Sequence, residues 1–169
     1  MTMVEMMAVV KFNGAQENAL VAKNLFLSDK KKKDNIFLVC AAHDTEIDMK
    51  ALTKALGVGS GNLRAGSLEK MEEKLGAKKG AVNLFAILND KPNAVTLVLD
   101  KRMTEADWVA YHPMDNTATT AISKADQMKV LQLAGHEPKI LDFASMAPAG
   151  GAPAAKPAPK KGGEKKPAQ

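Results

Sequence analysis

The sequence predicts an α/β fold, with a mixed, largely antiparallel sheet on which helices pack, in a single domain. Three observations lead to this prediction. Short apolar strands alternate with amphipathic helices up to Phe143, and the predicted strands outnumber the helices. Several neighbouring strands are joined by turns of hairpin length, which a doubly wound parallel sheet does not allow. Apolar runs such as AVNLFAIL indicate that the central strands are covered on both faces.

The first predicted elements form a hairpin. Residues 25–29 and 36–42 are strongly apolar, and they flank a charged stretch at 30–35 that contains four consecutive lysines. This pattern predicts two antiparallel strands joined by a charged turn. The lone cysteine, Cys40, falls inside the second strand, so we expect it to be buried by packing.

Two helices of similar design come next, over 48–57 and 67–76. Each begins with a capping side chain, Asp48 or Ser67, and each ends in a glycine. The apolar side chains expected to face the core are Met49, Leu52 and Leu56 in the first helix and Leu68, Met71 and Leu75 in the second.

In the second half of the chain, residues 81–88 and 95–99 are the most strand-like runs. The Asn-Asp-Lys-Pro-Asn turn between them predicts that they pair with each other. A last helix is expected to begin after the capping residue Ser123 and to continue through Ala134. Shorter strands are predicted at 108–111, 117–122 and 139–143.

Composition restricts the class of protein. The chain has 169 residues, of which 46% are hydrophobic and 25% are charged, as in globular domains. It has no apolar run of about 18 residues, so we expect no transmembrane span. With Cys40 as the only cysteine, neither an intrachain disulfide nor a multi-cysteine zinc site can form. This usage fits a reducing compartment, and we expect a cytoplasmic protein.

The net charge of +5 is concentrated at one end of the chain. The last 23 residues, 147–169, hold five lysines against one glutamate, so the rest of the protein is close to neutral. This end is composed almost wholly of Ala, Pro, Gly and Lys, which cannot bury a core. We therefore predict one domain over 1–146 and a disordered tail or linker over 147–169.

Familiar catalytic motifs are absent from the sequence, among them GxGxxG, GxxxxGK[ST], GxSxG and HExxH. The three histidines, His43, His112 and His136, lie in separate segments without ligand-like spacing. We therefore expect neither a metal nor a cofactor.

Three segments differ from ordinary core or surface, and each has two interpretations. Lys23 and Asn24 open an apolar strand, where they could line a cleft or simply form a solvated strand end. Gly76 and Gly80 bracket a short loop, which could offer backbone N–H groups to an oxyanion or could only end a helix. The run from His112 to Thr120 combines a His, an Asn and three Thr, which fits a polar site or a capped turn.

The motifs KNLFLSDKKKK (23–33), IDMKAL (47–52), LEKMEEKLGAKKGAVNLFAILND (68–90), VTLVLDKRMTEADWVAYHPMDNTATTAIS (95–123) and LQLAGHEPKILDF (131–143) resemble the YbaK family. Within that family, they are most similar to prolyl-tRNA-synthetase-associated editing domains. The resemblance covers nearly all of 22–143. It implies a curved mixed sheet and hydrolysis of the ester that joins a wrong amino acid, usually alanine, to tRNA(Pro).

The resemblance also implies roles for individual residues. Lys23 is expected to be catalytic and to hold the carbonyl oxygen or the terminal phosphate of the substrate. Asn24 would orient the terminal adenosine or the ester, and the amides of the loop from Gly76 to Gly80 would face the oxyanion. His112 would shape the pocket, and Asn116 would support its turn.

The implied partner is the acceptor end of mischarged tRNA(Pro), with prolyl-tRNA synthetase or a multi-synthetase complex as a further partner, and neither DNA nor a membrane. Two departures from the family pattern leave alternatives open: GAKKG stands where GVxPG is common, and NLFAI (83–87) stands where TPFAL is common. A non-catalytic docking module in a synthetase assembly is one alternative. A deacylase for Cys-tRNA or another small aminoacyl-tRNA is the other.

Overall fold

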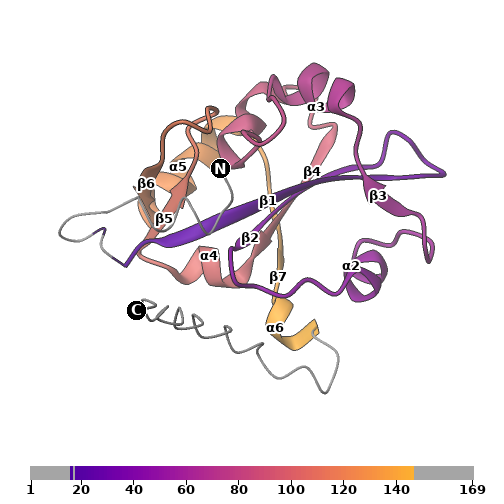
Figure 1. The fold of residues 1–169 in the computed structure, drawn as a ribbon, viewed down its shortest axis with the longest axis horizontal. Coiled ribbons are helices and arrows are strands. Elements are labelled where there is room, and N and C mark those ends of the chain that lie inside the picture. The colour runs from indigo at the N-terminus through magenta and orange to yellow at the C-terminus, as the bar shows by residue number, and fades with distance from the viewer. Residues whose placement is uncertain (1–15, 17, 147–169) are drawn as a thin grey trace, which may run out of the picture.

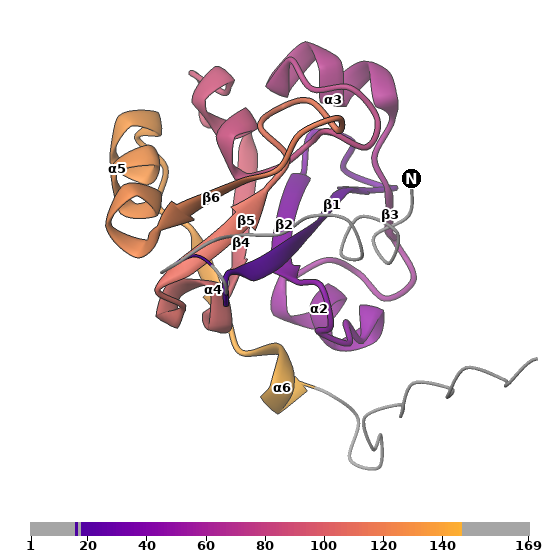
Figure 2. The same ribbon diagram turned by 60° about the vertical axis from the view of Figure 1, so that its left-hand side comes forward.

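The structure, a computed structural model, describes residue 16 and residues 18–146 (Figures 1 and 2). The strands are β1 (Leu20–Asp29), β2 (Ile36–Ala42), β3 (Leu63–Ala65), β4 (Val95–Asp100), β5 (Trp108–Tyr111), β6 (Thr120–Ser123) and β7 (Lys139–Leu141). The helices are α2 (Met49–Ala55), α3 (Leu68–Leu75), the 3-10 helix η2 (Leu84–Asn89), α4 (Lys101–Glu105), α5 (Lys124–Ala134) and α6 (Phe143–Met146).

In the described part of the chain, all seven strands belong to one sheet, in the order β6–β5–β1–β2–β4–β7, with β3 also paired to β1. The antiparallel pairs are β1–β2, β1–β3 and β5–β6, and the parallel pairs are β1–β5, β2–β4 and β4–β7. The predicted α/β fold with a mixed sheet and flanking helices is therefore confirmed, with parallel and antiparallel pairings in equal number.

The predicted hairpin is present as β1 and β2, which cross the centre of the molecule as two long twisted strands (Figure 1). Every residue of β2 is buried, and its side chains alternate between two apolar clusters on opposite faces of the sheet. Cys40 is buried in the larger cluster as expected, and burial raises the pKa of its thiol.

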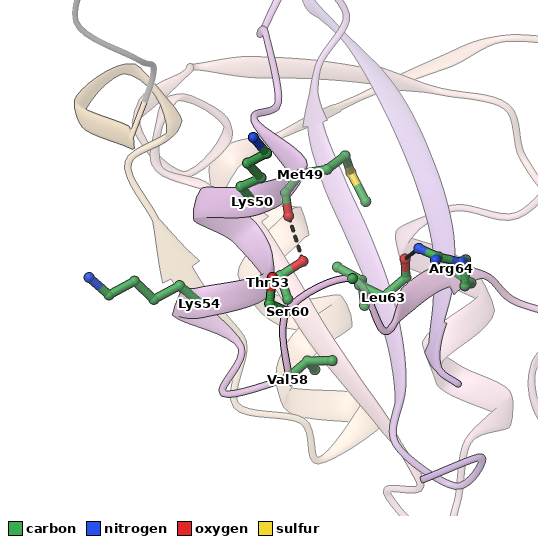
Figure 3. Close-up of a pocket in the computed structure, with 9 residues that line it drawn as sticks. Met49, Lys50, Thr53, Lys54, Val58, Ser60, Leu63 and Arg64 are labelled. Carbon is green, nitrogen blue, oxygen red and sulfur yellow. Dashed lines mark hydrogen bonds between the residues drawn. The ribbon is translucent and has the colours of Figure 1, made fainter. Parts of the chain in front are cut away.

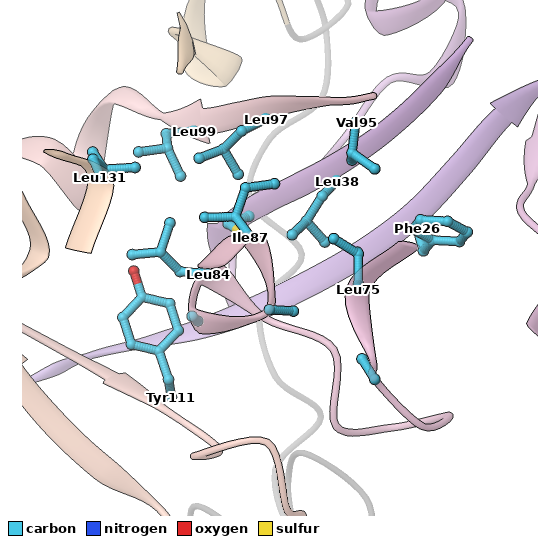
Figure 4. Packing of buried hydrophobic residues seen from close by; sticks show 14 of the residues in the cluster. Phe26, Leu38, Leu75, Leu84, Ile87, Val95, Leu97, Leu99, Tyr111 and Leu131 are labelled. Atoms are coloured by element: carbon cyan, nitrogen blue, oxygen red, sulfur yellow. The ribbon is translucent and has the colours of Figure 1, made fainter. Parts of the chain in front are cut away.

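The larger cluster lies between the sheet and the helices α3, η2 and α5 (Figures 2 and 4). Leu38, Leu97 and Leu99 of the sheet pack there with Leu84 and Ile87 of η2. The smaller cluster packs α2 and α6 on the opposite face, through their buried residues Leu52 and Phe143. Both faces of the central strands are thus covered, as the apolar runs predicted.

The strand predicted at 81–88 is wrong, because this segment is a turn followed by η2. Asn83 caps η2 by accepting a hydrogen bond from the amide of Phe85 at 2.8 Å. The expected partner, β4, is already paired on both edges, with β2 and β7, so it has no edge to offer. The apolar residues of the run pack onto the sheet instead of joining it.

The helix boundaries are predicted well, whereas two of the core assignments are wrong. Asp48, Ser67 and Ser123 cap their helices as expected. Met49 and Leu68, however, are 40% and 53% exposed. Each follows its cap directly, where the first turn faces solvent. The strand predicted at 108–111 is present with these bounds as β5, whereas β6 and β7 are shorter than the strands predicted at 117–122 and 139–143, and Phe143 belongs to α6.

No helix within the described residues has the length and apolar character needed to cross a membrane. Residues 147–169, predicted to form a tail, lie outside the described part of the chain.

Candidate functional site

The candidate site lies at a gap along one edge of β1. On this edge, β5 pairs with Leu20 and Val21, and β3 pairs with residues 27–29. Gly66 extends the second contact by donating its N–H to the carbonyl of Phe26. Among the described residues, 22–25 therefore have a strand partner on the β2 edge alone. Lys23 and Asn24 lie within this gap.

Lys23 lines an open cavity of about 590 Å³ together with the segment that follows β2, from His43 to Asp48. Its Nζ donates a hydrogen bond to the main-chain carbonyl of Thr45. Partial burial lowers the pKa of Lys23 by desolvation, and the carboxylates of Asp44, Asp100 and Glu46 oppose this shift in that order.

The segment beside Lys23 is fastened to the end of β4. Asp100 is 1% exposed, and its Oδ2 accepts hydrogen bonds from Thr45 Oγ1 at 2.6 Å and from the amide of Ala42 at 3.3 Å. Arg102 forms a two-pronged ion pair with Asp44, at 2.8 and 3.3 Å. The hydrogen bond from Arg102 lowers the pKa of Asp44, and the same pair raises the pKa of Arg102.

These anchoring residues were not predicted to belong to the site. Asp100 is the last residue of β4 and the N-cap of α4, where its carboxylate accepts a hydrogen bond from the amide of Arg102 at 3.0 Å. In the sequence it therefore looks like an ordinary helix cap. The polar run HDTE after an entirely apolar strand is the signal that could have drawn attention to Thr45. The contact between β4 and this run depends on the sheet order.

Asn24 follows Lys23 in an extended strand, so their side chains point to opposite faces of the sheet. Lys23 is paired with Ala41 of the smaller cluster, and Asn24 is paired with Cys40 of the larger one. The side-chain oxygen of Asn24 is buried and has no hydrogen-bond partner in the described chain. An amide oxygen of this kind can accept a hydrogen bond from a ligand.

His112 begins a polar turn after β5. Its Nδ1 lies 2.9 Å from the carbonyl of Ala118, and its own carbonyl accepts a hydrogen bond from the side-chain amide of Asn83. The turn includes Met114 with a φ of 61°, a conformation that few side chains adopt. If the parallel register of β1 and β5 is continued by two residues, His112 comes level with Lys23.

The loop from Gly76 to Gly80 approaches the same turn at one end only. A Cβ atom at Gly80 would lie 3.6 Å from the side-chain nitrogen of Asn116, which places these residues side by side. Gly76 ends α3 with a φ of 58°, and its amide donates to the carbonyl of Glu72 at 2.9 Å. The helix-stop interpretation is therefore correct for Gly76, whose N–H is already occupied.

The structure thus brings Gly80, His112 and Asn116 together, with Asn83 as their link. Lys23 lies with the segment after β2. No hydrogen bond or ion pair in the described part of the chain joins Lys23 to the loop at 76–80.

A second cavity of about 540 Å³ lies between α2 and β3 (Figure 3). Its lining includes the apolar side chains of Val58 and Leu63 and the basic residues Lys50, Lys54 and Arg64, and the ammonium ends of Lys50 and Lys54 point outward, away from Leu63. We call this feature the basic groove. Asp48 lines the Lys23 cavity and Met49, the next residue, lines the basic groove, so the two cavities flank the start of α2.

No group of three or more metal-ligating side chains occurs among the residues that the structure describes. The candidate site in this part of the chain consists of a half-buried lysine, polar side chains and backbone groups.

Solved structures share this fold at low sequence identity. A hypothetical protein of known crystal structure matches with a TM-score of 0.55 at 16% identity, covering 82% of this chain and 79% of its own. A "putative trans-editing enzyme for prolyl tRNA synthetase" matches with a TM-score of 0.50 at 18% identity, covering 72% and 68%. These matches establish the fold class, a mixed α/β sheet with flanking helices.

Sequence comparison identifies the family. The Aminoacyl-tRNA editing domain matches residues 2–130. The Mus musculus prolyl-tRNA synthetase associated domain-containing protein 1 is 43% identical over 124 residues, which is 72% of each chain. The prolyl-tRNA editing protein ProX of Acetoanaerobium sticklandii is 37% identical over 123 residues, or 73% of each. The chain belongs to the aminoacyl-tRNA editing domain family.

Proposed function

We propose that this protein hydrolyses the ester bond of mischarged tRNA(Pro), with Ala-tRNA(Pro) as its substrate, and thereby protects translation. The observation that carries the proposal is the placement of Lys23. Its ammonium group is half-buried beside a cavity at a gap in the sheet, and the carbonyl of Thr45 fixes it there. Family membership supplies the reaction class.

An aminoacyl ester is already an activated acyl group, so its hydrolysis needs a positioned water and stabilisation of the oxyanion. A lysine ammonium has three N–H donors. One is taken by Thr45, which leaves two for the ester carbonyl or the terminal phosphate of the substrate. In this role Lys23 acts by placing positive charge, and no covalent intermediate is required.

The other residues take supporting roles in this proposal. The unpartnered oxygen of Asn24 lies on the face of β1 opposite Lys23, so it accepts a hydrogen bond from the terminal ribose or adenine only if that nucleotide lies across the open edge of β1 at 22–25. Gly80 offers the backbone amide of the loop, because the amide of Gly76 is committed to its helix. His112 and Asn116 form the wall on the β5 side and hold the amino acid near the ester.

Selectivity follows from size. A synthetase site built for proline cannot strongly reject alanine, because missing methylene groups cost only about 1–3 kcal/mol of discrimination. A second pocket that is too small for proline admits alanine and excludes the cognate product by steric clash. Cysteine is the next amino acid that such a pocket could accept.

The basic groove is suited to the RNA part of the substrate. Lys50 and Lys54 of α2 and Arg64 of β3 place three positive charges around this groove, and Asp48, the N-cap of α2, lines the Lys23 cavity. Phosphate contacts of this kind supply affinity that does not depend on sequence. We propose that the acceptor stem lies along this groove, and that the lysines of 147–169 or prolyl-tRNA synthetase add further contacts.

The direct test is a deacylation assay with a panel of tRNAs charged with alanine, cysteine, serine and proline. We expect rapid hydrolysis of Ala-tRNA(Pro) and none of Pro-tRNA(Pro). Hydrolysis of Cys-tRNA alone would mean that the substrate is Cys-tRNA and not Ala-tRNA(Pro). Binding of tRNA without hydrolysis of any ester would favour a docking module, a role consistent with the occupied Gly76 amide and the changed loop GAKKG.

A further inference from the structure

We infer that Asp100 is a positioning residue for Lys23 and acts on it through Thr45. The inference rests on the proposed function, since it assumes that the ammonium group of Lys23 meets the substrate. It assigns a role in the reaction to a buried carboxylate at the far end of another strand.

The contacts form a continuous chain from β4 to β1. Asp100 Oδ2 accepts the hydroxyl hydrogen of Thr45 at 2.6 Å, and the carbonyl of the same Thr45 accepts a hydrogen bond from Lys23 Nζ. Asp100 and Thr45 are 1% and 7% exposed, so solvent does not replace these bonds. Ala42 and Arg102 donate their amides to the same carboxylate, which fixes its orientation.

A buried carboxylate is costly unless charge or several donors compensate for it. Asp100 has three donors, two from the backbone and one from Thr45. Thr45 Oγ1 is the single side-chain donor among them, and it belongs to the residue that anchors Lys23. The carboxylate therefore holds the carbonyl of Thr45 at a defined place relative to β1.

Position matters because a lysine side chain is long and flexible. The rotamer entropy of its four-carbon stem has to be lost before the ammonium group can act at one place. The Thr45 carbonyl restrains the ammonium group before substrate arrives, and Asp100 restrains that carbonyl. A displacement of about 1 Å in such a group can reduce a rate roughly 100-fold.

Charge is the second link between these residues. Burial disfavours the protonated form of Lys23, whereas the negative charge of Asp100 favours it. Asp44 exerts the largest effect of this kind on the pKa of Lys23, and Asp100 the next largest, so Asp100 adds to the charge that favours the hydrogen-bonding ammonium form. Arg102 also holds the segment in place through its ion pair with Asp44. The negative charge of Glu46 favours the protonated form of Lys23 as well.

The test compares variants at Thr45 and Asp100 in the full chain. Thr45→Val keeps the shape but removes the donor, Thr45→Ser keeps the donor, and Thr104→Val is the matched control on α4, where the hydroxyl bonds only to the carbonyl of Lys101. We expect Thr45→Val to lower kcat for Ala-tRNA(Pro) roughly 10- to 100-fold with little change in KM. Thr45→Ser should keep most of the wild-type kcat, and Thr104→Val should have the same kcat as the wild type.

An NMR titration of ¹³C-labelled lysine gives a readout that does not depend on activity. Asp100→Asn removes a negative charge, so the pKa of Lys23 should fall below its wild-type value. A mere loss of stability would not move this pKa in a folded protein. If Asp100→Asn does not fold, the comparison of Thr45→Val with Thr45→Ser decides the question.

The inference is overturned if folded Thr45→Val keeps its kcat, or if Lys23 titrates identically in folded Asp100→Asn. A wild-type protein that hydrolyses none of the mischarged tRNAs would instead reject the proposed function. In that case the titration still reports whether Asp100 and Lys23 are coupled, so the two failures are distinguishable.

Discussion

The side-chain amide of Asn83 donates a hydrogen bond to the main-chain carbonyl of His112, and so joins the start of η2 to the turn after β5. The same amide donates to the carbonyl of Ala81 at 2.9 Å, and its oxygen accepts from the amide of Phe85 at 2.8 Å. Asn83 is fully buried. One side chain thus fixes the relative positions of two loops of the candidate site.

Replacing Asn83 with alanine should destabilise the protein by roughly 2–4 kcal/mol, because buried backbone groups lose their partners. Asn89→Ala is the matched control, since Asn89 is exposed and makes a single hydrogen bond, to the carbonyl of Leu75. The control should lose about 1 kcal/mol or less. Urea unfolding of both variants measures the difference, and equal losses would contradict the linking role of Asn83.

The activity should depend on pH through Lys23. Desolvation lowers the pKa of Lys23 from its ordinary value, so the ammonium group loses its proton at a lower pH than an exposed lysine, whose pKa is about 10.4. Because only the protonated form donates hydrogen bonds, deacylation should decline on the alkaline side below that value. Deacylation rates measured over the alkaline pH range, and corrected for spontaneous ester hydrolysis, test this decline.

The control for the pH profile is Lys23→Arg, which remains protonated throughout the accessible range. Its residual activity should show no alkaline decline. An identical decline in this variant would mean that another group titrates.

Arg64→Ala should weaken RNA binding without affecting the chemical step. Arg64 is exposed in the basic groove, so its loss should raise KM for Ala-tRNA(Pro) and leave kcat nearly unchanged. The slope of log KM against log salt should fall by about 1. Lys91→Ala, an exposed lysine on the turn before β4, is the control. An equal effect of both variants would show that the groove is not the RNA surface.

Truncation after Met146 should cost little folding stability, because 147–169 contain almost no core-forming residues. If these lysines contact RNA, truncation raises KM at low ionic strength, and the difference shrinks as salt increases. Kinetics of both chains at two salt concentrations test this. A severe loss of kcat would mean that the segment helps to build the site, and unchanged kinetics would favour tethering to a protein partner.

The sequence predicts local structure well where a residue's own neighbours determine it. Asp48, Ser67 and Ser123 cap helices because a short polar side chain can reach the next backbone amides, wherever the helix later packs. The segment 81–88 shows the limit of such reasoning. Its apolar residues fit a strand or a buried helix equally well, and the occupied edges of β4 decide against the strand.

The candidate site shows a similar division. Lys23, Asn24 and His112 stand out in the sequence through their motifs. Asp100 and Thr45 do not, because their contact requires β2 and β4 to be neighbours in the sheet, and they are 55 residues apart. The opposed directions of Lys23 and Asn24 follow from strand geometry and could have been predicted.

The most direct test of the proposed activity is the hydrolysis of Ala-tRNA(Pro) by the wild type and by Lys23→Ala, with folding checked by circular dichroism. We predict that the wild type deacylates Ala-tRNA(Pro) and spares Pro-tRNA(Pro), and that the folded variant is inactive because no other lysine or arginine is among the described residues that line this cavity. A folded Lys23→Ala protein that retains near-normal turnover would contradict the assignment of Lys23 and of the site built around it.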